Sequence, residues 1–110
     1  RDGGYETARD LLRSGTDATC LFAVNDVMAV GAMAACREEG VAVPDDLSVA
    51  GFDDIETLRD VAPALTTVRL PLVEMGERAA SLALDGEDGP TIVRVKGEVI
   101  LRDSTAAPRA

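Results

Sequence analysis

Two pairs of polar residues, each at the end of an apolar run, have the side chains best suited to bind a ligand. The pair Asn25-Asp26 follows the first run, and the pair Asp53-Asp54 follows the second. A strand, a crossover helix and the next parallel strand need about 30 residues, and the two pairs lie 28 residues apart. We therefore expect Asn25 and Asp53 to lie side by side on neighbouring strands.

Together these two side chains favour a ligand that carries hydroxyl groups. An ionised Asp53 can accept two hydroxyl donors, and Asn25 adds one donor group and one acceptor. In open parallel sheets the carboxyl ends of the strands form the crevice where ligands bind. The alternative is structural, because such residues also cap helices and close turns. We assign this second role to Asp26, as the cap of the following helix, and to Asp54, as a partner of nearby backbone amides.

The elements that must position these residues alternate between helices and strands. Apolar spacing and turn residues predict, in order, a helix that ends near Ser14, a strand over residues 20–24, a helix from Asp26 that stops at Gly40, a strand over residues 47–52 and a short helix that ends before Pro63. This order predicts an α/β fold, a parallel sheet with flanking helices and right-handed crossovers. The unbroken apolar character of residues 20–24 indicates a strand covered on both faces.

The character of the chain changes after Pro63. A β-branched strand over residues 65–68 leads to Arg69, an amphipathic helix starts at Leu72, and two alternating segments cover residues 92–95 and 99–101. We expect a surface ion pair for Arg69, with a bond to a neighbouring carboxylate as the alternative. By itself the helix from Leu72 would expose an apolar stripe.

Composition excludes several functions for this segment. A net charge of −9 without a cluster of Lys or Arg argues against a grip on a nucleic-acid backbone. With no His and no metal-ligand spacing of Cys20 and Cys36, we expect no metal site. Neither cysteine lies beside a base and no glycine-rich phosphate loop is present, so we expect no catalytic residue, no cofactor and no enzyme. No apolar run could span a membrane, and two buried thiols would suit the cytoplasm.

Four segments resemble the lactose/galactose-repressor (LacI/GalR) family of bacterial transcription regulators. They are residues 22–32, 43–54, 63–69 and 102–105, and they include Asn25-Asp26 and Asp53-Asp54. The match follows the whole chain in order. It implies the carboxyl-terminal part of a periplasmic-binding-protein-like (type I) sensor domain, in which two lobes close over a small effector.

The resemblance also implies how the chain is divided between the lobes. Residues 1–68 would belong to the carboxyl-terminal lobe, residues 69–96 to the amino-terminal lobe, and residues 97–110 would return to the first. The crossing segment would be residues 68–71, so a bridge between the lobes is a further alternative for Arg69. Effector binding would control a repressor allosterically, through lobe closure and a homodimer. The helix-turn-helix that binds operator DNA would lie upstream of Arg1, in a cytoplasmic protein that does not contact a membrane.

The same resemblance assigns roles to single residues. Asn25 and Asp53 match positions that bind the effector, a sugar or another small molecule, and Leu72 matches a position that forms an apolar wall. Some relatives carry an aromatic ring in place of Leu72, so the identity of the ligand stays open. In the family, the face of the helix after Asn25-Asp26 and the segment near residues 57–61 help to form a dimer. The resemblance therefore implies a dimer role for Val30, Met33 and Val61.

Two other classes of protein stay open at this point. An extracytoplasmic sugar-binding protein of a transport system has the same expected fold, and a Rossmann-like enzyme lobe has a related one. Sequence upstream of Arg1 would discriminate among the three. A helix-turn-helix indicates the regulator, a signal peptide indicates the transport protein, and a glycine-rich phosphate loop indicates the enzyme.

Overall fold

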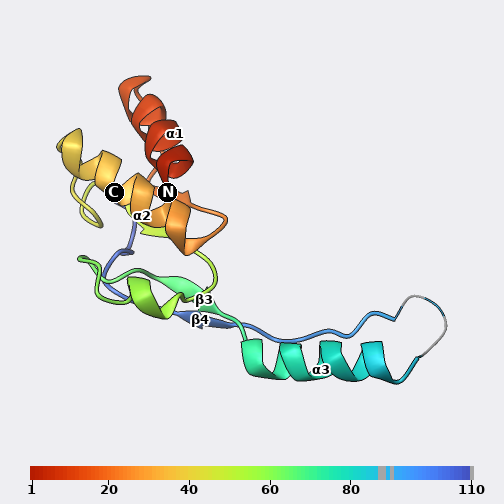
Figure 1. Ribbon diagram of the computed structural model, residues 1–110. Helices are drawn as coiled ribbons and strands as arrows, with labels where there is room; N and C mark the ends of the chain where they lie inside the picture. The colour runs from red at the N-terminus through yellow and green to blue at the C-terminus, as the bar shows by residue number, and fades with distance from the viewer. Residues whose placement is uncertain (87–88, 90, 110) are drawn as a thin grey trace.

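The computed structural model describes residues 1–86, 89 and 91–109 and confirms the α/β order (Figure 1). Its elements are α1 (Asp2–Arg13), β1 (Cys20–Phe22), α2 (Asp26–Glu38), β2 (Ser48–Ala50), the 3-10 turn η1 (Glu56–Leu58), β3 (Thr67–Arg69), α3 (Leu72–Leu84) and β4 (Glu98–Ile100). Among the described helices, none is long and apolar enough to cross a membrane.

The predicted parallel neighbours are present. β1 pairs with β2 in parallel, with Leu21 opposite Val49. Two isolated parallel bridges, Ala50 to Thr66 and Asp53 to Arg69, join the β2 segment to the β3 segment. β4 then pairs antiparallel with β3, so the chain leaves along one strand and returns along the other.

The core lies between α2 and the sheet. Ala29, Met33 and Cys36 of α2 pack against three buried residues from the sheet side, Leu47, Val49 and Leu65. α1 covers the outer side of α2 at very short range, because a Cβ atom on Gly31 would lie 2.2 Å from the carbonyl oxygen of Arg1. One packed unit, which we call the body, therefore comprises α1, α2, β1, β2 and the chain as far as Leu65.

α3 projects from the body with the returning segment alongside it (Figure 1). None of the residues of α3 is buried, and Leu72, Val73 and Leu84 are 62%, 77% and 86% exposed. The radius of gyration is 17.2 Å, whereas a compact domain of this length would have roughly 13 Å. We call the described part of residues 70–97 the arm, and its apolar stripe is exposed as the sequence predicted.

Several local predictions were wrong. β1 is not covered on both faces, because Cys20 and Phe22, which point to the same side of the strand, are exposed, Phe22 by 60%. The Cys20 thiol is accordingly exposed, while Cys36 is buried and burial raises the pKa of its thiol. The predicted short helix before Pro63 is a single 3-10 turn, and residues 92–95 form no strand.

Candidate functional site

Asn25 lies at the junction of β1 and α2 and is the N-cap of α2. Its backbone is extended, with φ −154°, and its side-chain Oδ1 accepts a hydrogen bond of 2.9 Å from the amide of Met28. The sequence predicted Asp26 as the N-cap of this helix, and that prediction was wrong by one residue. Within the described chain the Nδ2 group of Asn25 has no protein acceptor, which leaves a donor at the partly exposed end of the strand.

Asp26 is buried and joins three elements instead of capping one. Its Oδ1 accepts from the Thr67 hydroxyl at 2.6 Å, and its Oδ2 accepts from the amide of Ile55 at 2.8 Å. Gly51 makes room for this carboxylate, because a Cβ atom there would lie 2.5 Å from Asp26 Oδ1. Asp26 thus fixes the start of α2 against β3 and the segment before η1.

The structure brings Asn25 and Asp53 together at neighbouring strand ends. The amide of Asp26 donates to the carbonyl of Phe52 at 2.9 Å, so the two candidate residues flank one backbone hydrogen bond. Asp53 is held by its own amide, which donates to the carbonyl of Val68 at 2.9 Å. The spacing argument is confirmed at the level of the backbone.

The carboxylate of Asp53 is half-buried and forms no hydrogen bond or ion pair with any described residue. Its backbone has φ 114°, in the left-handed region that a residue with a Cβ atom adopts at a cost of about 1–3 kcal/mol. Such strain persists only where the surrounding structure holds it. The backbone at Asp53 is therefore held by its surroundings, while the acceptor atoms of its carboxylate are unpaired among the described residues.

Asp53 and Leu72 line the same hollow, which has a volume of about 380 Å³. Small-molecule sites typically have roughly 300–1,000 Å³. The body contributes Asp53, Asp54 and Arg59, and the arm contributes apolar residues that include Leu70 and Leu72. Asn25 does not line this hollow, so the structure joins two of the three predicted effector residues directly and the third through the neighbouring strand.

Asp54 is the centre of an ion cluster that the sequence analysis missed. Its side chain is 1% exposed and accepts from Arg69 Nε at 2.7 Å, Arg102 Nη2 at 2.8 Å and Arg59 Nη2 at 3.0 Å. Burial would raise the pKa of this carboxyl, but the hydrogen bonds from the three arginines outweigh burial and lower the pKa to about 2. Asp54 is therefore ionised under all ordinary conditions.

This cluster corrects two predictions. Asp54 bonds to arginine side chains, not chiefly to backbone amides, and Arg69 reaches a buried carboxylate instead of a surface partner. A signal was present, because Arg69 follows a buried strand segment that ends at the same sheet edge as Asp53-Asp54. Arg59 and Arg102 carried no such signal, since only the folded chain brings them to that edge.

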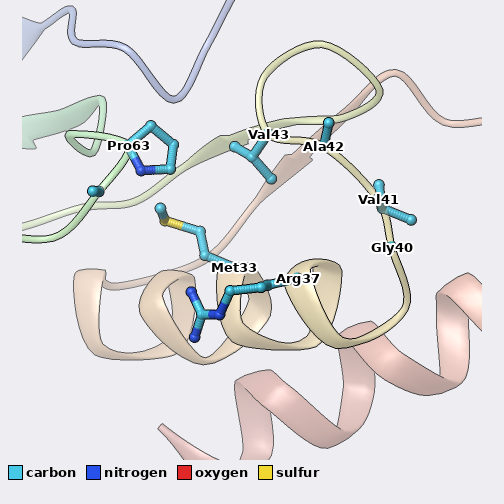
Figure 2. A pocket seen from close by; sticks show the side chains of 8 residues that line it. Met33, Arg37, Gly40, Val41, Ala42, Val43 and Pro63 are labelled. Carbon is cyan, nitrogen blue, oxygen red and sulfur yellow. The ribbon is translucent and has the colours of Figure 1, made fainter.

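The three predicted dimer residues lie together on the body. Val30, Met33 and Val61 line a hollow of about 260 Å³ beside Arg37. An adjoining hollow of about 330 Å³ continues past Met33, whose side chain points from α2 toward Pro63 (Figure 2). Apolar residues and two cations, Arg1 and Arg37, line this surface, and no Asp or Glu is among its lining residues.

Metal ligation has no support in the described residues, which contain no group of three His, Cys, Asp or Glu side chains that could hold an ion.

Comparison with known proteins defines the class to which this fold and site belong. The family model for the periplasmic binding protein-like domain matches residues 2–105, and the chain belongs to this family. Within it, the chain is a member of the LacI/GalR group of transcription regulators, as the resemblance implied. It is 43% identical over 108 residues to the HTH-type transcriptional regulator AscG of Escherichia coli, covering 96% of this chain.

Solved structures agree. A LacI family regulator from Enterococcus faecium with bound ribose superposes with a TM-score of 0.84 at 34% identity, covering 99% of this chain and 41% of that one. A dimeric Lac repressor superposes with a TM-score of 0.83 at 29% identity, covering 96% and 40%. These relatives are regulators and not enzymes, as predicted for this chain. The chain spans about a third of the length of AscG, 32%.

Proposed function

We propose that this chain is the effector-binding part of a LacI-type transcription repressor, and that Asp53 is its principal contact with the effector. The single observation that carries this is the half-buried, unpaired Asp53 carboxylate, which lines a hollow together with Leu72. Hydrogen bonds to a charged group contribute about 1.5–3 kcal/mol each, so two ligand hydroxyls on Asp53 would supply much of the affinity. The bound ribose of the Enterococcus faecium relative supports a sugar as the ligand class.

Asn25 and Leu72 complete the proposed site. The free Nδ2 of Asn25 would donate to a hydroxyl of a ligand that extends toward the neighbouring strand, while Oδ1 stays bonded to Met28. Leu72 would cover an apolar face of the ligand from the arm. Leu72 is 62% exposed, and cover by a ligand would remove apolar surface from water.

The division into lobes follows the body and the arm. Residues 1–68 would form the carboxyl-terminal lobe, residues 69–96 part of the amino-terminal lobe, and residues 97–110 would return. A helix-turn-helix in the full-length protein would bind operator DNA, in the cytoplasm. Ligand-dependent closure would change operator affinity through a coupling free energy of typically 1–3 kcal/mol.

The experiment is a thermal-shift panel of neutral pentoses, hexoses and disaccharides on the full-length protein. A ligand at 100 times its dissociation constant stabilises the folded state by about 2.7 kcal/mol. For the sugar that binds, Asp53→Asn should weaken binding about tenfold or more, because a charge-assisted bond becomes a neutral one. Asn is chosen because it tolerates positive φ better than Ala.

The matched control is Asp45→Asn, an exposed carboxylate in the loop between α2 and β2 that does not line the hollow. It should leave sugar binding unchanged. Equal affinity of the Asp53→Asn variant and the wild type would exclude Asp53 as the effector contact. Binding that leaves operator affinity unchanged would instead favour a binding protein without a regulatory role.

Dimer formation is the second part of the proposal. The apolar surface that contains Val30, Met33 and Val61 would pair with the same surface of a second copy, as expected for a two-fold interface. Val61→Glu, which would bury an unpaired charge, should convert the full-length dimer to a monomer in sedimentation velocity. Val24→Glu, two residues after β1 at 66% exposure, is the control that should remain dimeric.

A further inference from the structure

The arm is joined to the body by two passages of the chain, and one buried carboxylate is bonded to both. The chain leaves the body along β3, which ends at Arg69, and it re-enters just after β4, at Arg102. Arg69 Nε lies 2.7 Å from Asp54 Oδ2, and Arg102 Nη2 lies 2.8 Å from Asp54 Oδ1. Each carboxylate oxygen of Asp54 is therefore bonded to an arginine on a different passage.

The third arginine has a different position. Arg59 directly follows η1 and contacts Asp54 Oδ2 at 3.0 Å and the Asp54 carbonyl at 3.4 Å. It belongs to the same segment as Asp54, so its ion pair closes a local loop and crosses no passage. All three ion pairs join an arginine to the Asp54 carboxylate. The pairs of Arg69 and Arg102 reach a passage between body and arm, and the pair of Arg59 does not.

Little else described fixes the angle between arm and body. α3 has no buried residue and supplies no residue to either described core cluster. Arg102 also donates through Nη1 to the Leu65 carbonyl at 3.0 Å, which anchors the returning passage to the end of the core. At the point where the angle is set, the ion cluster adds side-chain contacts to the β3–β4 ladder and to the backbone hydrogen bond from Asp53 to Val68.

The angle matters because the hollow has one wall on each side. Asp53 belongs to the body and Leu72 to the arm, and Asp54 is the next residue after Asp53. A rotation of the arm would change the separation between Asp53 and Leu72, and hence the width of the hollow. We propose that Asp54 is a positioning residue that sets this width, by fastening Arg69 and Arg102, and with them the arm, next to the effector contact. This inference rests on the proposed function of the hollow.

The test measures the arm directly, in the full-length protein and without a ligand. Spin labels at Glu6→Cys on α1 and Glu77→Cys on α3, in a Cys20→Ser background because the Cys20 thiol is exposed, report the body-to-arm distance by double electron–electron resonance. We expect a narrow distance distribution that broadens and shifts in Arg69→Gln and in Arg102→Gln. Arg59→Gln should leave it narrow.

Each variant removes one of the three cations that pair with the Asp54 carboxylate. If only the loss of an ion pair mattered, all three variants would broaden the distance distribution equally. Broadening in Arg59→Gln as large as in the other two, or an unchanged distribution in all three, would overturn the proposal. Asp54→Asn should broaden the distribution most. If that variant does not fold, the arginine series still decides, and Asp46→Asn, which loses an exposed pair with Arg109, controls for charge removal elsewhere.

The measurement also separates this inference from the proposed function. The distance distribution needs no sugar, so it reads the junction even if no member of the sugar panel binds. Asp53→Asn should weaken sugar binding and leave the distribution narrow. The Arg69 and Arg102 variants should broaden it whether or not Asp53 is the effector contact.

Discussion

The hydroxyl of Thr67 on β3 donates to the carboxylate of Asp26 at the start of α2 over 2.6 Å, and both side chains are buried. The same hydroxyl oxygen accepts from the amide of Asp54 at 3.3 Å. Thr67 therefore lies between the two polar strand ends and bonds to one residue of each pair. Its position holds the start of α2 and the segment after β2 against β3.

Removal of this hydroxyl should destabilise the body. Thr67→Val keeps the shape of the side chain but leaves a buried carboxylate oxygen and a buried amide short of a partner, which costs about 1–3 kcal/mol. Urea unfolding should show a lower midpoint with an unchanged slope. Thr57→Val, at an exposed position in η1, is the control. Equal midpoints for the two variants would mean that the Thr67 hydroxyl contributes nothing.

A second prediction concerns acid. The pKa of Asp54 is about 2, against an ordinary value of 3.8, because the hydrogen bonds from Arg69, Arg102 and Arg59 outweigh the effect of burial. A lowered pKa in the folded state means that the unfolded state binds this proton more tightly. The stability from Asp54 is therefore fully present above about pH 4 and is lost as the pH falls through about 2.

The difference in unfolding free energy between the wild type and Asp54→Asn measures this loss. It should shrink by about 2 kcal/mol between about pH 5 and about pH 2, since other carboxylates titrate in both proteins. Urea unfolding at several pH values gives the comparison. Parallel curves for the two proteins would show that Asp54 titrates alike in the folded and unfolded states. Asp45→Asn, at an exposed position, should give such parallel curves.

The sequence predicted those features of the fold that depend on neighbouring residues and on regular spacing. The distance of 28 residues between Asn25 and Asp53 sufficed to place two strand ends together, because the βαβ unit has nearly fixed dimensions. The N-cap is Asn25 and not Asp26, because a one-residue shift in the start of a helix changes which side chain reaches the free amides. Apolar spacing does not resolve a helix boundary to one residue.

The ion cluster lay beyond sequence reasoning for a different reason. Asp54 meets Arg69 and Arg102 across 15 and 48 residues of chain, and no periodic pattern carries a contact of that range. The exposure of Phe22 was missed likewise, because an apolar run predicts a strand and not the number of its neighbours. Spacing therefore placed the two candidate residues side by side, but the contacts around them required the folded chain.

Two helical glycines should respond to alanine with opposite signs. Gly31 in α2 faces α1, and a Cβ atom there would lie 2.2 Å from the Arg1 carbonyl and 2.8 Å from the Tyr5 amide. Gly31→Ala should therefore destabilise by about 1–3 kcal/mol through overpacking. Gly76 in α3 has no described heavy atom within 4 Å of such a Cβ, so Gly76→Ala should stabilise by about 0.5–1 kcal/mol.

Thermal unfolding of the two variants beside the wild type checks this pair. Gly4→Ala should behave like Gly31→Ala, because its Cβ would lie 2.3 Å from the Met28 carbonyl on the facing helix. A stabilised Gly31→Ala would contradict the close packing of α1 on α2. A destabilised Gly76→Ala would show that the inner face of α3 is covered.

The exposed apolar stripe of the arm should make the 110-residue chain self-associate. Val73 and Leu84 on α3 are 77% and 86% exposed, and burial of such surface between copies is favourable. Val73→Lys combined with Leu84→Lys should shift sedimentation velocity toward the monomer, while the same change at Leu11 on α1, 38% exposed, should not. Lysine is the sharper choice because the chain carries a net charge of −9. A smaller net charge by itself promotes association, so a shift toward the monomer can come only from the lost apolar contact. A double variant that sediments like the wild type would exclude the arm as the contact surface.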